Sequence, residues 1–200
     1  MDGLQSPNDK TASTGWNSLL TESNPVDDIG FLKSLAQFMQ EKYGLTREET
    51  FAAGFSNGAF MMYRLALEGQ DHFCAVASIC GRMPEKLWPL RGEKASVGLL
   101  QISGTKDDVI PMRLNSTDKY TRSPAIEDVV AWFAESQGLS TEKETELAPG
   151  VVLFKYLEAG GTQKVWHVIV KDGHHGWFEK KYSGFDANDI ILDFFDSYYA

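Results

Sequence analysis

The sequence predicts an α/β fold, with three layers in which helices cover both faces of a mostly parallel sheet. Short continuous apolar runs occur at residues 73–79 and 96–103, and such runs are typical of strands buried on both faces. Segments with helical periodicity alternate with these runs. Residues 50–60 read as a strand, a tight turn and a helix. Strands that alternate with helices favour a parallel sheet joined by crossover helices.

Length and composition are those of one globular domain spanning residues 1–200. The chain has 200 residues, 42% of them hydrophobic, and a net charge of −9. Because Lys and Arg are scattered without a basic stripe, nucleic acid is not expected as a partner. No apolar run approaches the roughly 20 residues of a membrane-spanning helix, so no membrane association is expected. The first thirty residues lack the apolar core of a signal peptide, and the chain as given is expected in the cytoplasm.

The two cysteines are too few for a disulfide scaffold. Cys74 and Cys80 stand six positions apart on one apolar run, too far to bridge, and we interpret both as buried thiols. Unpaired cysteines suit a reducing compartment. The cysteines and histidines show no metal-ligand spacing, so neither a metal nor a cofactor is expected.

The first predicted helix follows an irregular arm at residues 1–26, and residues 27–200 form the core portion. Apolar residues recur at helical spacing from residue 29 to 43, with Asp27 and Asp28 at the expected N-terminus and Gly44 closing the run. A strand at residues 50–55 and a helix at about 59–68, ended by Gly69, come next.

Five further elements are expected toward the C-terminus. A loop at residues 81–92 is expected to cross the strand ends. A helix is predicted from about Ser123 to Gln137, with Ser123 as its cap and Pro124 at its first position. Residues 151–158 and 164–171 read as two strands of a hairpin, joined by Ala-Gly-Gly-Thr. The apolar face at residues 188–199 predicts a final helix packed on the core.

The turn at residues 54–58 has the pattern Gly-x-Ser-x-Gly. A serine at the tip of a strand-turn-helix has strained backbone geometry, and the flanking Gly54 and Gly58 leave room for strand and helix to approach each other. This geometry would expose the Ser56 hydroxyl as a nucleophile. The pattern is also common by chance, and the alternative is an ordinary loop in which Ser56 caps the helix.

Candidate partners for Ser56 follow two later strands, in the order serine, acid, histidine. Asp107 and Asp108 follow the strand at 96–103, and His174 and His175 follow the strand at 164–171. The carboxyl ends of parallel strands meet at one sheet edge, where catalytic groups gather. The alternatives are turn-forming aspartates and exposed or metal-binding histidines. The coincidence of three strand-end loops in the right order favours a Ser-Asp-His triad.

Four ordered motifs resemble the polyhydroxybutyrate depolymerase and feruloyl/acetylxylan esterase group of α/β-hydrolases. They are Asp-Asp-Ile-Gly-Phe-Leu at 27–32, Gly-Phe-Ser-Asn-Gly at 54–58, Gly-Thr-Lys-Asp at 104–107, and Gly-His-His-Gly-Trp at 173–177. The resemblance implies a serine esterase with Ser56 as nucleophile. It selects Asp107 over Asp108 as the acid, and it selects His175, two residues before Trp177, as the base.

The same resemblance implies a specific oxyanion hole and a longer fold. The backbone N–H of Asn57, the residue after the nucleophile, would be one oxyanion donor. The family has further strands before the helix at residue 27, with a loop that supplies the second donor, and we expect this chain to be truncated relative to that fold. Losing a donor typically costs about 10² to 10³ in turnover, so the alternative function is a weak or inactive hydrolase-like scaffold.

Two further expectations concern partners and substrate. The strand from Thr50 to Phe55 would lie at an open sheet edge, where we expect a second copy of the chain or a completing segment. The substrate is expected to be a carboxylic ester, with a polymer-linked alcohol or acid among the options. Trp177 beside His175, and Phe55 beside Ser56, are the aromatic residues expected to contact it. Relatives in the resembled family are often secreted.

Overall fold

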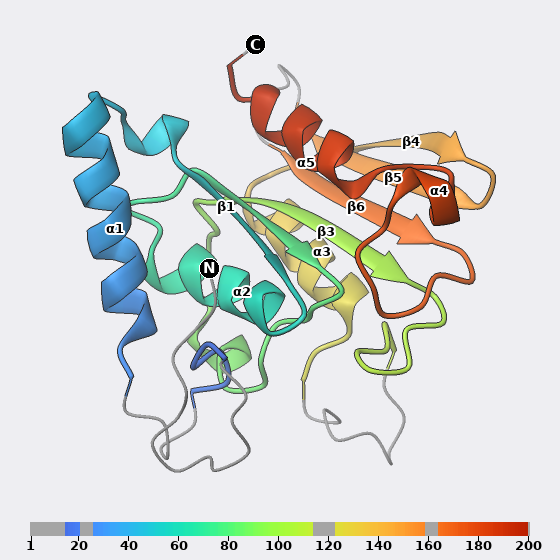
Figure 1. Ribbon diagram of the computed structural model, residues 1–200, viewed down its shortest axis with the longest axis horizontal. Coiled ribbons are helices and arrows are strands. Elements are labelled where there is room, and N and C mark those ends of the chain that lie inside the picture. The colour runs from blue at the N-terminus through green and yellow to red at the C-terminus, as the bar shows by residue number, and fades with distance from the viewer. Residues whose placement is uncertain (1–14, 21–25, 114–122, 159–163, 200) are drawn as a thin grey trace.

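A six-stranded mixed sheet forms the centre of the computed structural model, which describes residues 15–20, 26–113, 123–158 and 164–199 (Figure 1). The strand order is β1-β2-β3-β6-β5-β4; the first four are mutually parallel, and β5 and β4 continue the sheet antiparallel. The strands are β1 (Phe51–Phe55), β2 (Ala75–Ile79), β3 (Gly98–Gly104), β4 (Thr141–Ala148), β5 (Val151–Leu157) and β6 (Val165–Val170). The predicted fold class is confirmed.

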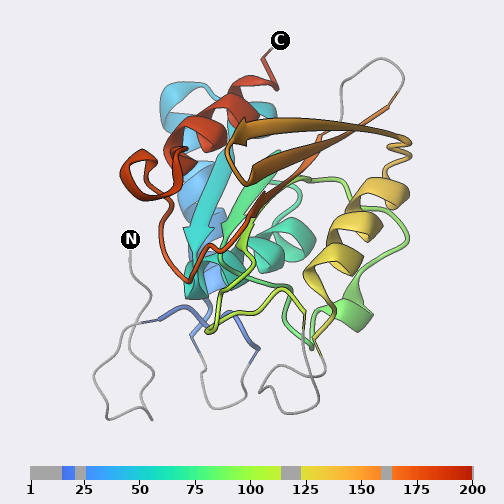
Figure 2. The same ribbon diagram turned by 90° about the vertical axis from the view of Figure 1, so that its right-hand side faces the viewer.

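Helices cover both faces of the sheet, as Figure 2 shows, with α5 on one side and α2 and α3 on the other. One apolar cluster joins α2, α3 and α1 to the first face, and a second joins α5 to the opposite face. The helices are α1 (Asp28–Tyr43), α2 (Asn57–Glu68), α3 (Ile126–Ser136), α4 (Lys180–Ser183) and α5 (Ala187–Asp196), with short 3₁₀ turns at Arg47–Glu49 and Trp88–Leu90. In the described part of the chain, no helix is long and apolar enough to cross a membrane.

The start and end signals of α1 act as the sequence predicts. The Asp27 side chain caps the helix by accepting the Gly30 N–H at 2.9 Å, and Gly44 ends it in the left-handed conformation with φ 67°. Strands β1, β2, β3, β5 and β6 and helices α2 and α5 also lie where they were expected, within about three residues at each end. The 159–162 turn of the predicted hairpin, and most of the 1–26 arm, lie outside the described residues.

Helix α3 also lies within three residues of its predicted bounds, but its predicted start was wrong and one strand was missed. The N-cap is Ala125 in place of Ser123, and Pro124 precedes the helix, where its carbonyl accepts a hydrogen bond from Arg82 at 2.6 Å. Strand β4 was missed, since its sequence Thr-Glu-Lys-Glu-Thr-Glu-Leu-Ala is polar and lacks an apolar face. It forms because β5 offers a pairing edge, and charged side chains suit an edge strand.

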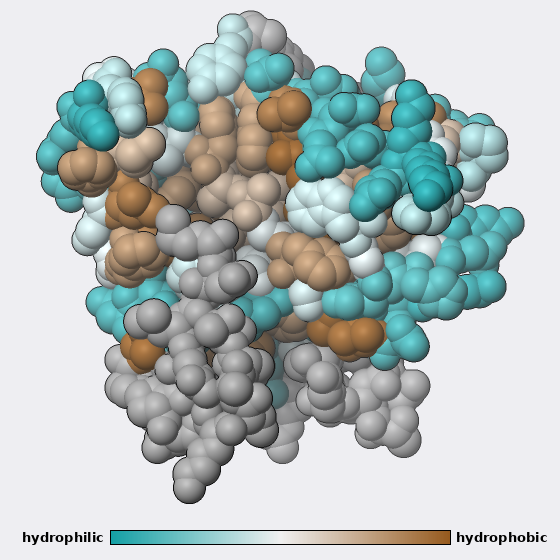
Figure 3. Space-filling model, in the orientation of Figure 1, coloured by the Kyte–Doolittle hydropathy of each residue, from teal (hydrophilic) through white to brown (hydrophobic). Residues whose placement is uncertain are grey.

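Strand β1 occupies the opposite edge of the sheet and pairs, among the described residues, with β2 alone. Beside it runs a groove of about 750 Å³ between α1, β1 and α2. Figure 3 shows apolar residues gathered over this region. Its lining is mostly apolar and includes Leu32, Leu35, Met39, Phe51, Ala53, Phe55, Met62, Leu65 and Phe73, with Ser56 and Asn57 at one end.

Candidate active site

Ser56 stands at a strained turn between β1 and α2. Its backbone has φ 52° and ψ −113°, a region that residues with a side chain rarely adopt. A Cβ atom on Gly54 would lie 2.3 Å from the carbonyl oxygen of Gly58, so glycine is required at position 54 for strand and helix to approach. Within the described part of the chain, a Cβ on Gly58 would meet only the Trp16 indole nitrogen, at 3.9 Å. The close approach of β1 and α2 therefore requires glycine at position 54 but not at position 58.

His175 connects Ser56 to Asp107 through its two ring nitrogens. Nε2 lies 3.0 Å from the Ser56 Oγ, and Nδ1 lies 2.9 Å from the Asp107 Oδ2. The Ser56 side chain makes no capping hydrogen bond to α2, which argues against the alternative of a simple cap. With Nδ1–H donating to the Asp107 carboxylate, Nε2 is the nitrogen that can accept a hydrogen bond from the Ser56 hydroxyl.

Asp107 is held in place from both sides. Its Oδ1 accepts the backbone N–H groups of Val109 at 3.0 Å and Ile110 at 2.7 Å, which leaves Oδ2 directed at His175. The Asp107 side chain is 2% exposed and that of His175 is 15% exposed. Asp108 and His174 are exposed instead, so the fold brings together the pair that the sequence resemblance selected.

The loops that carry Asp107 and His175 are braced against each other. Lys106 N–H donates to the Gly173 carbonyl at 2.9 Å, and Asp172 N–H donates to the Thr105 Oγ1 at 2.8 Å. An exposed ion pair joins the Lys106 Nζ and the Asp172 Oδ1 at 2.8 Å. These contacts hold the loop of Asp107 against the loop of His175, in addition to the hydrogen bond between the two side chains.

Comparison with known proteins identifies the family. Residues 20–143, more than half of the chain, match the phospholipase/carboxylesterase family. The chain belongs to this family of α/β-hydrolases.

A curated relative and several solved structures are also similar. "Putative esterase NocK" of Nocardia uniformis subsp. tsuyamanensis is 25% identical over 177 residues, which cover 77% of this chain. The chain spans about half of that relative's length, 49%. An acetyl xylan esterase from Aspergillus awamori has a TM-score of 0.54 at 12% identity, covering 92% of this chain and 72% of the other. Esterase PE8 has a TM-score of 0.51 at 15% identity, covering 82% and 59%. At these identities the structures show a shared fold.

Asn57 begins α2 and contacts the segment at residues 15–18. Its Oδ1 accepts the Trp16 N–H at 2.6 Å, and its Nδ2 donates to the Ser18 Oγ at 2.8 Å. The Asn57 backbone amide lies in the first turn of α2, where amides have no acceptor within the helix and the helix dipole is positive. This is the amide that the sequence predicted as an oxyanion donor.

The two predicted substrate-contact residues border the imidazole. The ring centroid of Phe55 lies 5.1 Å from that of His175 and 6.2 Å from that of Trp177, the latter in an edge-to-face arrangement. Trp177 is 37% exposed and Phe55 is half-buried. Phe55 thus packs against the imidazole and Trp177 packs edge-on against Phe55, and we call this pair of rings the aromatic border.

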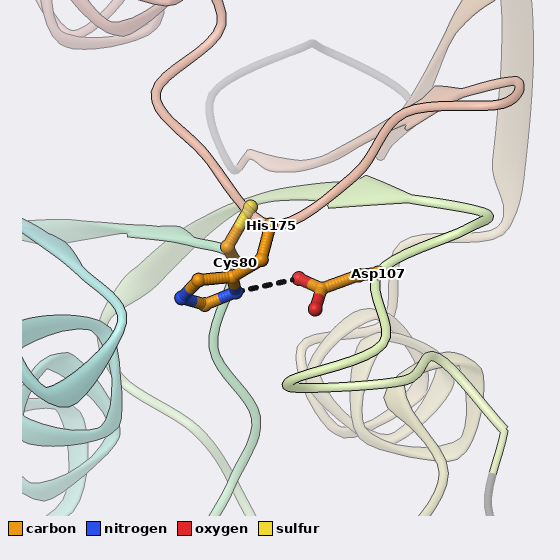
Figure 4. A group of neighbouring side chains, drawn as sticks. All are labelled: Cys80, Asp107 and His175. Atoms are coloured by element: carbon orange, nitrogen blue, oxygen red, sulfur yellow. Dashed lines mark hydrogen bonds and ion pairs between the residues drawn. The ribbon is translucent and has the colours of Figure 1, made fainter.

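Sequence reasoning missed the position of Cys80. It read both cysteines as buried thiols, and both are buried and free. Cys80, however, is the first residue after β2, and its ligand atom lies within 4.8 Å of those of Asp107 and His175 (Figure 4). Its backbone is left-handed, with φ 50°, and its thiol donates to the Gly176 carbonyl at 3.4 Å. Burial raises the pKa of the Cys80 thiol to about 12.

Four neighbouring parallel strands thus each end in one polar group of the site. In sheet order β1, β2, β3 and β6 they contribute Ser56, Cys80, Asp107 and His175. A signal for Cys80 was available in the sequence, because it follows a buried strand at the edge where ligands of open α/β sheets bind.

Proposed function

We propose that this chain is a serine hydrolase of carboxylic esters, with Ser56 as nucleophile, His175 as general base and Asp107 as the group that orients the base. The observation that carries the proposal is the continuous hydrogen-bonded path from Asp107 Oδ2 through both nitrogens of His175 to Ser56 Oγ. The strained turn at Ser56 supports it, since strain of this kind clusters at functional sites. Family membership supports ester chemistry.

The reaction proceeds in two acyl transfers. Ser56 Oγ attacks the ester carbonyl carbon while its proton passes to His175 Nε2, and the Asp107 carboxylate stabilises the imidazolium through Nδ1. The Asn57 N–H donates to the developing oxyanion. His175 then returns the proton to the departing alkoxide, which leaves Ser56 acylated. Water then attacks the carbonyl carbon of the acyl-enzyme and passes a proton to His175 Nε2. His175 returns this proton to Ser56 Oγ as the carboxylic acid leaves.

Esters of the polyester, feruloyl or acetylxylan type are the proposed substrates. The ordered motifs that carry the sequence resemblance support this class. The aromatic border of Phe55 and Trp177 adds a physical reason, because flat apolar rings offer a stacking surface for a feruloyl group or a sugar face.

A pair of measurements tests the catalytic assignment. We expect hydrolysis of a short acyl nitrophenyl ester and covalent labelling of the protein by a fluorophosphonate, both lost in Ser56→Ala and both retained in Ser140→Ala, an exposed serine on a loop. Equal turnover in Ser56→Ala would reject the nucleophile. Absence of both turnover and labelling in the parent protein would instead support the alternative, a hydrolase-like scaffold.

A further inference from the structure

We propose that Cys80, His175 and Asp107 form a binding site for a thiophilic divalent cation, with Zn²⁺ as the best-matched ion, and that binding there switches the esterase off. Metal binding itself does not depend on the esterase reaction, whereas the inhibition rests on the proposed function. The site uses one residue that the mechanism leaves unused and two that it needs.

The donor set matches zinc chemistry. Zinc prefers thiolate sulfur, imidazole nitrogen and carboxylate oxygen, and sites with three protein ligands keep a fourth position for water. The ligand atoms of the three residues lie within 4.8 Å of one another. In a tetrahedral zinc site the ligand atoms are about 3.4 to 3.6 Å apart, as follows from the usual zinc–ligand bond lengths. Shifts on the order of 1 Å in these side chains therefore close the site.

The backbone arrangement favours convergence of the three side chains. Each stands at the carboxyl end of a parallel strand or in the loop that follows it, on β2, β3 and β6, and β3 lies between the other two. The left-handed backbone of Cys80 turns the chain sharply where the strand ends, and the thiol contact with Gly176 holds the sulfur against the His175 loop. Two backbone N–H bonds fix the Asp107 carboxylate on the third side.

The binding step exchanges a proton for a metal ion. The Cys80 S–H bond breaks and its proton passes to solvent, waters leave the hydrated cation, and metal bonds form to the Cys80 sulfur, to one ring nitrogen of His175 and to the Asp107 carboxylate. If the ring nitrogen is Nδ1, its proton is lost and Nε2 takes up a proton in its place. No electrons are transferred. A coordinated thiol is deprotonated by the metal itself, so the ion supplies the driving force for ionising a buried thiol.

Coordination removes His175 from catalysis whichever ring nitrogen it uses. Nδ1 faces Asp107 and Nε2 faces Ser56, so a metal on Nδ1 displaces the orienting hydrogen bond and a metal on Nε2 blocks the proton acceptor. Zinc is therefore expected to inhibit the esterase reversibly, because it occupies the His175 side chain that proton transfer needs. A chelator is expected to restore the activity.

Cobalt titration of the intact chain tests the site without reference to activity. We expect one equivalent of Co²⁺ to produce a thiolate-to-cobalt charge-transfer band and the visible bands of tetrahedral cobalt, both displaced by Zn²⁺. Cys80→Ser removes the charge-transfer band, while Cys74→Ser retains it. Cys74 is the matched control because it is also free and buried but lies just before β2, at the opposite end of that strand. Circular dichroism verifies that each variant is folded.

Zinc inhibition provides the second readout. For each protein, the rate of nitrophenyl ester hydrolysis in the presence of Zn²⁺ is compared with the rate of the same protein without metal. We expect Cys80→Ser to raise the half-inhibitory Zn²⁺ concentration at least about tenfold, since even indirect partners of a metal site cost 10- to 100-fold in affinity. A charge-transfer band that persists in folded Cys80→Ser, or that is absent from the parent protein, overturns the proposal. An inactive parent that still shows the Cys80-dependent band retains the site and rejects only the esterase assignment.

Discussion

Gly104 and Gly173 approach so closely that a Cβ atom on Gly104 would lie 2.3 Å from the Gly173 carbonyl oxygen. Gly104 ends β3 before Asp107, and Gly173 precedes His175. The two loops that carry the proposed acid and base therefore meet at a contact that only glycine permits.

We expect Gly104→Ala to separate these loops and reduce kcat of ester hydrolysis by about 10- to 100-fold, because small misplacements of catalytic groups are costly. The comparison variant is Gly92→Ala, where a Cβ would meet no atom of the described residues within 4 Å and the rate is expected to stay unchanged. Equal rates for both variants would show that the close contact does not position the site.

Asp107→Asn is expected to lower kcat by roughly 10⁴, because an amide cannot hold the reactive tautomer of His175. Asp108→Asn, one residue away and exposed, is expected to retain the parent rate. Steady-state kinetics on one nitrophenyl ester compares the two. A large loss in Asp108→Asn with a small one in Asp107→Asn would reverse the assignment of the acid.

Trp177→Ala is expected to raise KM for a feruloyl ester about three- to tenfold while changing KM for an acetyl ester less, since loss of an aromatic pair costs about 0.5–1.5 kcal/mol. Tyr43→Ala, which removes an exposed aromatic ring on α1, serves as the control. The same change in KM for both esters would remove Trp177 from the acyl-binding surface.

His167 provides a pH-dependent contribution to stability. It is buried on β6, its Nε2 has no hydrogen-bond partner among the residues that the structure describes, and burial lowers its pKa to about 4. The unfolded chain binds the proton below about pH 6.5, whereas the native state remains neutral until about pH 4. The free energy of unfolding therefore falls as pH falls through this window.

Urea titrations of the parent and His167→Leu at pH 7.0 and 4.5 measure this contribution. We expect the parent to lose on the order of 2 kcal/mol more stability than the variant between the two values. Identical losses would mean that His167 does not carry the acid sensitivity.

For the open edge of β1 we propose pairing with β1 of a second copy of the chain. The groove beside the edge is apolar, and α1 adds the exposed side chains of Phe31 and Phe38. Sedimentation velocity is expected to show a dimer that Ala53→Lys dissociates, because a charge on an edge strand opposes pairing. Leu192→Lys, on the exposed face of α5, is the control. A stable monomer of the parent chain would contradict this expectation.

Local signals in the sequence predicted most elements because those elements carry their own pattern. The cap at Asp27 and the glycine at 44 limit α1, and continuous apolar runs mark β2 and β3. Strand β4 escaped prediction because its sequence has no strand pattern and it is a strand through its pairing with β5. The N-cap of α3 escaped prediction because it is Ala125, whose side chain makes no capping hydrogen bond and therefore leaves no signature in the sequence.

The residues of the candidate site also divide into those with a local sequence signal and those placed together only by the fold. Three motifs after three strands indicated Ser56, Asp107 and His175, since each motif has a local signature. Cys80 belongs to no motif, and its one sequence signal is its place after a buried strand; its proximity to His175 follows from the order in which the strands lie side by side. Sequence spacing cannot reveal a cluster whose members are assembled by sheet topology.

The positive-φ residues at the ends of β1 and β2 also bear on engineering for thermostability. Ser56 and Cys80 have φ 52° and 50°, and a sparsely populated backbone conformation of this kind costs a residue with a side chain roughly 1–3 kcal/mol. Glycine at either position would relieve that cost, yet at position 56 it would delete the proposed nucleophile. At position 80 glycine would leave the serine in place, but it would also remove a side chain that is 2% exposed within the second apolar cluster, so lost packing offsets the relief of backbone strain.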